Sequence, residues 1–342
     1  MKFAQRARFS HNMNAEQIWQ RSCHENAVMR FRRLALLAVV ELLCVVGILD
    51  AQDLGHKLPG LIGLDAGTIP PPGLSVIDRF VVYNADQVRD RNGNPIPIGV
   101  ELRGISNAVG ISYTHKLPQG CTSFSARAAA PVAGLRLNVQ DRPEASVDQF
   151  GLADIYIMPL GWGCETGRFD IVASYGLYIP TGQFLLAGGK GVSTGQVTHQ
   201  FSFGGSIYRN KDRTSFITAL ASYDLNLRKR NIDLTRGDLF LIQGGIGVRR
   251  HNQVLEMGLA SFALWQVRDD RGADLPPVLL GARDRVFGLG PEVAVLIKSI
   301  NSQLRARYEW DIAARSRPQG NVFAVGINIL VHHPRQPASP AP

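Results

Sequence analysis

The chain has 342 residues, of which 45% are hydrophobic and 19% are charged, and its net charge is +9. This length suffices for one large or two ordinary domains, and the composition is too apolar for a disordered protein. The cations are scattered and form no basic run interleaved with aromatic residues, so nucleic-acid binding has little support. Glycine contributes 35 residues without a Gly-X-Y period, which excludes collagen and favours a strand-rich protein with many turns.

An apolar run near the N-terminus predicts a secretory signal. Three arginines precede Leu34–Leu49, which is apolar apart from one glutamate and ends shortly before Ala51. We therefore expect residues 1–51 to be an N-terminal extension and signal segment that is cut after Ala51. The true start is Met1 or Met29. An uncleaved anchor is the alternative, although 16 residues with a glutamate inside are short for a helical span.

The chain after the signal segment repeats a two-residue period. Gln303–Ile312 reads QLRARYEWDI, in which every second side chain is polar and those between are apolar. This period is typical of strands, and the longer segments exceed the five or six residues of an ordinary strand. No later run has 18 uninterrupted apolar residues, which excludes a helical membrane protein. About twelve such segments lie near 75–84, 98–115, 121–138, 147–162, 167–180, 196–209, 213–228, 237–250, 253–266, 284–299, 302–314 and 319–331.

The connections between these segments alternate in length. The short turns are Lys116–Gly120, Gly163–Thr166, Asn210–Asp212, His251–Asn252 and Ile300–Asn301. The longer links are Ala85–Pro97, Val139–Ser146, Thr181–Gly195, Lys229–Arg236, Val267–Arg283 and, as the shortest, Arg315–Pro318. Outer-membrane barrels have short periplasmic turns and long external loops, whereas a soluble barrel or sandwich has no reason to sort them. We therefore predict an all-β protein whose residues 74–331 form an antiparallel up-and-down transmembrane β-barrel of about 12 strands in the bacterial outer membrane.

The charged residues of the strands are expected to face the lumen. An arginine that faces hydrocarbon costs about 2–4 kcal/mol near the bilayer midplane, so the apolar members of each strand should face lipid. The lumen-facing candidates are Glu256, Glu292, Lys298, Arg305, Arg307, Glu309 and Asp311. They could line a solute path, or form a salt-bridged network that fills a narrow lumen and keeps the strands in register. Inward aromatic residues at Phe216, Phe262 and Tyr178 would suit an apolar solute or ordinary packing.

Two cysteines remain after a cut at Ala51. Cys121 and Cys164 lie at the short-turn end of neighbouring strands, and in a hairpin whose paired numbers sum to 285 they would face each other. An oxidising periplasm permits a bridge if the geometry fits. A redox or metal site is the alternative, but two thiols with no histidine nearby make a poor metal set. We predict a structural disulfide.

Two segments lie outside the strand pattern. Residues 52–73 show neither strand nor helix periodicity, so they form either a loose leader or a plug that folds back into the lumen. Residues 332–342 are proline-rich and are expected to be a disordered tail.

Motifs of the known enzyme classes are absent after residue 51. The chain has no HExxH, nucleophile elbow or P-loop there. Outer-membrane phospholipases place a histidine two positions before a serine, whereas His199 and Ser202 are three positions apart and should point to opposite faces of a strand. We predict that the protein is not an enzyme and binds no cofactor or metal.

Several segments of the predicted strands and loops form recognisable motifs. They are FGLADIYIMPLGW at Phe150–Trp162, YGLYIPTGQF at Tyr175–Phe184, LGPEVAV at Leu289–Val295, PQGNVFAVG at Pro318–Gly326, and the first strand and loop at Leu74–Pro97. Together these motifs resemble the family named for the MetA pathway of phenol degradation. The resemblance covers about Pro70 to Val331 and implies an outer-membrane barrel, often treated as a transporter of aromatic or other hydrophobic compounds. The chain departs from the family in the loop Thr181–Gly195, which lacks the usual Asn- and Trp-rich run.

The resemblance and the pattern lead to one functional expectation and one alternative. We expect passive uptake of small hydrophobic or aromatic compounds, gated by residues 52–73; the alternative is a structural or adhesive barrel that presents its long loops. The expected partners are the lipid bilayer, a small apolar solute and the barrel-assembly machinery. That machinery reads a terminal aromatic residue in many barrels, whereas the last strand here ends INILV.

Overall fold

The computed structural model describes residue 56 and residues 59–140, 146–184, 192–275 and 280–332. The expected signal segment 1–51, the choice between Met1 and Met29, and nearly all of the expected tail 332–342 lie outside these residues. The described part of the chain contains no helix with the length and apolar character needed to cross a bilayer.

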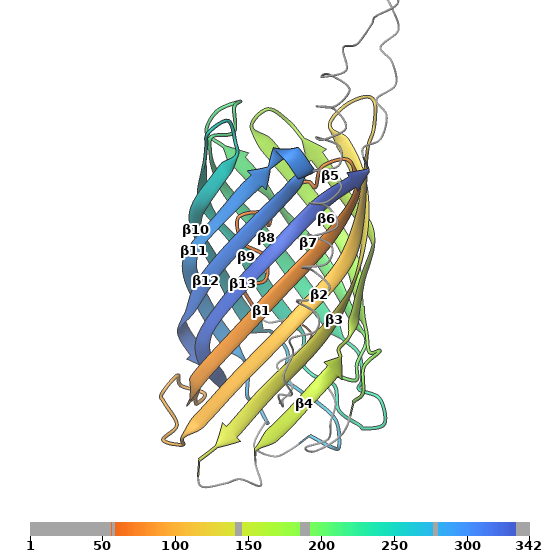
Figure 1. Ribbon diagram of the computed structural model, residues 1–342. Helices are drawn as coiled ribbons and strands as arrows, with labels where there is room; N and C mark the ends of the chain where they lie inside the picture. The colour runs from red at the N-terminus through yellow and green to blue at the C-terminus, as the bar shows by residue number, and fades with distance from the viewer. Residues whose placement is uncertain (1–55, 57–58, 141–145, 185–191, 276–279, 333–342) are drawn as a thin grey trace, which may run out of the picture. The chain divides into compact units, whose positions relative to one another are not determined.

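Strands make up most of the described chain and run antiparallel to their neighbours (Figure 1). β4 and β5 pair with successive parts of β3 and are separated only by Ala153 and Asp154, so together they form one broken barrel strand. β1 pairs with β13, which closes the sheet on itself and confirms the predicted twelve-stranded antiparallel barrel. The strands are β1 (Gly73–Arg89), β2 (Val100–Lys116), β3 (Thr122–Val139), β4 (Val147–Leu152), β5 (Ile155–Glu165), β6 (Phe169–Ile179), β7 (Thr198–Tyr208), β8 (Ser215–Asn226), β9 (Leu239–Arg250), β10 (Leu255–Gln266), β11 (Arg285–Ile297), β12 (Ser302–Arg315) and β13 (Arg317–His332).

The two-residue period separates an apolar outer surface from a polar lumen. On β12, Trp310 and Ile312 are 49% and 63% exposed, whereas Glu309 and Asp311 are buried inside the barrel. A closed sheet gives every strand two neighbours, so backbone donors and acceptors of the wall are paired without water. The outer face of such a barrel can therefore lie in hydrocarbon.

The turns sort by length as predicted, with one exception. Five short turns lie at the end of the barrel where β1 begins and β13 ends, and the longer connections lie at the opposite end. The predicted sixth link, Arg315–Pro318, is wrong as a loop, because Ser316 alone separates β12 from β13. Ser316 adopts a left-handed conformation with φ of 53°, and its N–H donates to the Asp90 carbonyl at 3.0 Å. Pro318 pairs with Val88, so β13 continues past the proline to the turn.

Candidate functional site

Four charged side chains on β10, β11 and β12 form a network inside the barrel. Arg305 bridges two carboxylates: its Nη1 lies 3.0 Å from Oε1 of Glu256 and also contacts Glu292. Arg307 pairs across the sheet with Glu292, with Nη1 3.0 Å from Oε2. The network continues to β9, where Arg249 lies 2.8 Å from Glu256. Glu256 and Glu292 are thus each matched by neighbouring guanidinium groups.

The same wall holds the next two acids of β12. Arg307 Nε lies 3.1 Å from Glu309 Oε2. Asp311 accepts a hydrogen bond from the Tyr83 hydroxyl at 3.0 Å and another from the Gly320 N–H at 2.9 Å. The structure therefore brings six of the seven expected lumen residues onto one wall.

Lys298 is the exception and is not a lumen residue. It begins the short 3-10 helix Lys298–Ile300, which forms the turn between β11 and β12, and it is exposed. Lys298 was predicted to face the lumen from the alternation of side chains along β11. This strand ends at Ile297, so the alternation does not extend to Lys298 in the turn.

A segment that precedes β1 lies against this wall. Two backbone groups of residues 59–72 donate hydrogen bonds to side chains of the strands. The Leu64 N–H donates to Glu292 Oε2 at 3.0 Å, and the Gly67 N–H donates to Thr218 Oγ1 at 2.8 Å. The Leu64 side chain is fully buried beside Tyr208 and Phe216. We call residues 59–72 the inner segment, because these contacts place it in the barrel interior.

Glycines let the inner segment approach the wall. A Cβ at Gly63 would overlap Glu292 and Arg307, and a Cβ at Gly67 would overlap the backbone of Gly205 on β7. A side chain at either position would have to displace the wall or the segment. The segment is thus held by both hydrogen bonds and close packing.

A cavity of about 640 Å³ remains beside the inner segment. Small residues of β2 and β3, such as Ala108, Gly110 and Ala129, line part of it. Tyr156, which pairs with Ala129 from the neighbouring strand β5, and Tyr178 also line it, with ring centroids 4.8 Å apart. The cavity therefore presents small apolar side chains and two aromatic rings to a solute.

The three expected inward aromatic residues have different surroundings. Phe216 and Phe262 are almost completely buried in separate packed clusters, and the Arg249 guanidinium lies 4.6 Å from the Phe216 ring centroid. Tyr178 lines the cavity, and its ring stacks on the His56 ring with the two centroids 4.7 Å apart. Only Tyr178 of the three is placed to meet a solute in this cavity.

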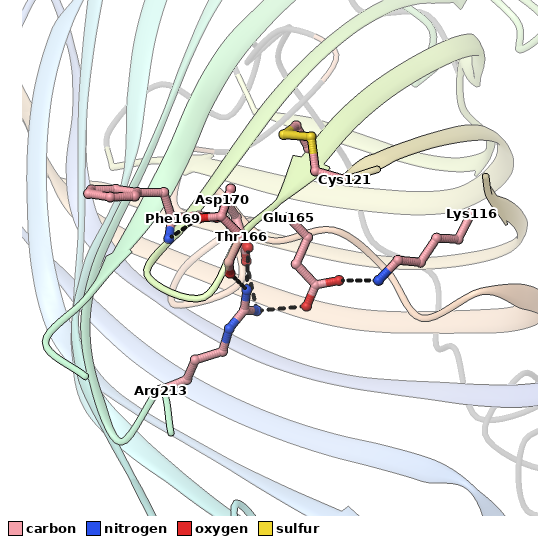
Figure 2. The surroundings of a disulfide bond; sticks show 8 residues. Lys116, Cys121, Glu165, Thr166, Phe169, Asp170 and Arg213 are labelled. Atoms are coloured by element: carbon pink, nitrogen blue, oxygen red, sulfur yellow. Dashed lines mark hydrogen bonds and ion pairs between the residues drawn. A yellow bond between two sulfur atoms is a disulfide. The ribbon is translucent and has the colours of Figure 1, made fainter. Parts of the chain in front are cut away.

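The structure contains a disulfide between Cys121 and Cys164, whose Cα atoms are 4.7 Å apart (Figure 2). The predicted hairpin paired residues whose numbers sum to 285. In the structure this sum is one higher at the Thr122–Cys164 pair and one lower at the Leu137–Val147 pair. The break between β4 and β5 and a bulge beside Arg127 absorb this change.

Charges tie the turns around the disulfide together, as Figure 2 shows. Glu165 forms ion pairs with Lys116 and with Arg213, both at 3.0 Å, and Arg213 also binds Asp170 at 2.8 Å. These contacts connect β2, β5 and β6 with the turn that precedes β8. The disulfide and these pairs lie at the short-turn end of the barrel and brace it there.

His199 and Ser202 lie on opposite faces of β7, as expected. The His199 Nδ1 is 2.8 Å from the Tyr175 hydroxyl, whereas Ser202 is buried on the inner face. A histidine–serine pair of the phospholipase type is therefore not formed by these two residues.

Comparisons with known proteins agree with this architecture. The family model described as "Putative MetA-pathway of phenol degradation" matches residues 85–326. The chain is similar in structure to an outer membrane channel from Pseudomonas putida F1, with a TM-score of 0.69, 9% identity, and coverage of 80% of this chain and 99% of that one. It is also similar to the translocator domain of the autotransporter NalP from Neisseria meningitidis, with a TM-score of 0.43, 15% identity, and coverage of 78% and 91%. No curated protein sequence matches the chain. The first of these structures shows a shared fold.

Proposed function

The chain belongs to the family described for the MetA pathway of phenol degradation, and we propose that its barrel lets small hydrophobic or aromatic compounds cross the bacterial outer membrane passively. The observation that carries this proposal is the cavity of about 640 Å³, which is lined by small residues and two tyrosine rings. Cavities with mostly apolar walls and a few polar groups are typical of small-molecule sites.

The contents of the lumen favour a small solute. Paired charges occupy the side of β10 to β12, and the inner segment lies against them. Both narrow the path, and the cavity of about 640 Å³ is the space that remains beside them. A small solute with an apolar face would contact small side chains and aromatic rings as it passes through this cavity.

The outer surface and the fold support the location. The exposed face of the strands is apolar, and the channel from Pseudomonas putida F1, which has the same fold, is named an outer membrane channel. A closed barrel of this kind needs no other element to cross the bilayer.

Uptake by cells tests this function. A deletion strain should take up radiolabelled aromatic compounds at low external concentration several-fold more slowly than its parent, and a plasmid copy should restore the rate. A deletion strain with parental uptake and growth across a wide panel of apolar substrates would contradict transport. It would favour the alternative of a structural or adhesive barrel.

A further inference from the structure

Arg127 is a lumen arginine for which the described residues provide no ion pair, unlike Arg305 and Arg307. It lies on β3 and pairs with Ser112 and Met158, both buried on the inner face, so its side chain points into the barrel. Its Nε is shielded from solvent and has no hydrogen-bond partner among the residues that the structure describes. No ion pair with Arg127 occurs within those residues either.

The neighbouring arginines are engaged in contacts. Arg79 donates to the Leu61 carbonyl at 2.6 Å, and Arg305 and Arg307 bind Glu292. A buried charge is normally paired or hydrogen-bonded, because removing it from water without compensation is unfavourable. The Arg127 guanidinium lines the cavity, so it is available to an anion that enters it.

The cavity that Arg127 lines also holds aromatic and small side chains. Tyr156 lies on β5 opposite Ala129, two residues along β3 from Arg127, and its ring contacts Tyr178. Ala108, Gly110 and Ala129, on the neighbouring strands β2 and β3, line the same cavity with little side-chain bulk. A planar apolar group can lie against the tyrosine rings while a charged group attached to it reaches Arg127.

We propose that Arg127, Tyr156 and Tyr178 form a subsite for small aromatic carboxylates. The carboxylate accepts hydrogen bonds from the Arg127 guanidinium, which presents several donors in one plane and fits a carboxylate with two parallel bonds. The aromatic ring packs on the tyrosines. This inference rests on the proposed function and names the solutes that the channel binds best.

Binding to the purified full barrel in detergent tests the subsite. The probes are 4-fluorobenzoate and 4-fluorobenzamide, which are close in shape but differ in charge, and fluorine NMR titration gives their affinities. The wild-type protein should bind the benzoate about tenfold more tightly than the amide, as expected for one charge-assisted contact. Arg127→Gln should remove this preference and leave the amide unchanged, and Arg127→Lys should keep part of it.

Control measurements separate the possible outcomes. Arg103→Gln removes an exposed cation of β2 and should keep the wild-type preference, and heat-modifiable migration checks that each variant is folded. A preference that survives Arg127→Gln, or equal binding of both probes to the wild type, would overturn the subsite while the proposed function stands. Failure of the wild type to bind either probe, together with normal uptake in the deletion strain, would overturn both.

Discussion

The carboxylate of Glu292 accepts the Leu64 N–H at 3.0 Å while it pairs with Arg307, so one acid joins the barrel wall to the inner segment. Glu292 is almost completely buried, and its other oxygen contacts Arg305. Loss of this single group would leave two buried guanidinium groups under-compensated and would release the segment. The ion network therefore has a structural role for the wall and for the segment that lies on it.

We predict that Glu292→Gln destabilises the barrel by about 3 kcal/mol, because removal of one partner of a buried ion network leaves uncompensated charge. Urea unfolding of the protein in lipid vesicles, followed by tryptophan fluorescence, measures this change. Asp148→Asn is the matched control, because Asp148 pairs with Arg136 at the surface, where such pairs contribute about 0–1 kcal/mol. Equal effects of the two substitutions would contradict a structural role of the network.

The inner segment should leave the wall when its close approach is blocked. Gly63→Leu places a side chain where Glu292 and Arg307 lie, so we expect the segment to be displaced and the ionic conductance of single barrels in planar bilayers to rise several-fold. Gly151→Ala is the control, since a Cβ at Gly151 meets nothing within 4 Å. Conductance that stays at the wild-type level in both variants would show that the segment does not narrow the path.

The disulfide should contribute to stability without affecting the lumen. We expect the double substitution Cys121→Ala and Cys164→Ala to lower the free energy of unfolding by about 2–4 kcal/mol, because the bridge restrains a long stretch of the unfolded chain. Wild-type protein treated with reductant should match the double variant. Reductant should have no effect on the double variant itself, and uptake by both should equal that of the wild type.

Much of the barrel could be predicted from the sequence because strand parity is a local property. Alternation in QLRARYEWDI correctly separated Trp310 and Ile312 from Glu309 and Asp311, since neighbouring side chains of a strand must point to opposite faces. The alternation gave a wrong prediction for Lys298, because the strand ends before this residue. The loop predicted at Arg315–Pro318 was also wrong, because Ser316 is the only residue between β12 and β13.

The contents of the lumen could not be predicted in the same way. The inner segment has no period, and its position depends on contacts with residues such as Glu292 and Thr218, which lie more than 150 residues away along the chain. Arg127 could have been predicted to face the lumen, because it follows the alternation of its strand, although the alanines around it give no further sign of a site. That the described residues offer Arg127 no ion pair becomes evident only when the surrounding strands are in place.

The outward face of β9 offers a direct test of the membrane environment. Ile246 is 59% exposed and lies within the apolar band, between Ile217 of β8 and Leu259 of β10. Because an arginine facing hydrocarbon near the midplane costs about 2–4 kcal/mol, Ile246→Arg should lower the free energy of unfolding in lipid vesicles by that amount. Leu280→Arg, at a loop position with 57% exposure, should change it by less than about 0.5 kcal/mol. If the two substitutions had the same small effect, this face of the barrel would be in contact with water and the protein would not span a bilayer.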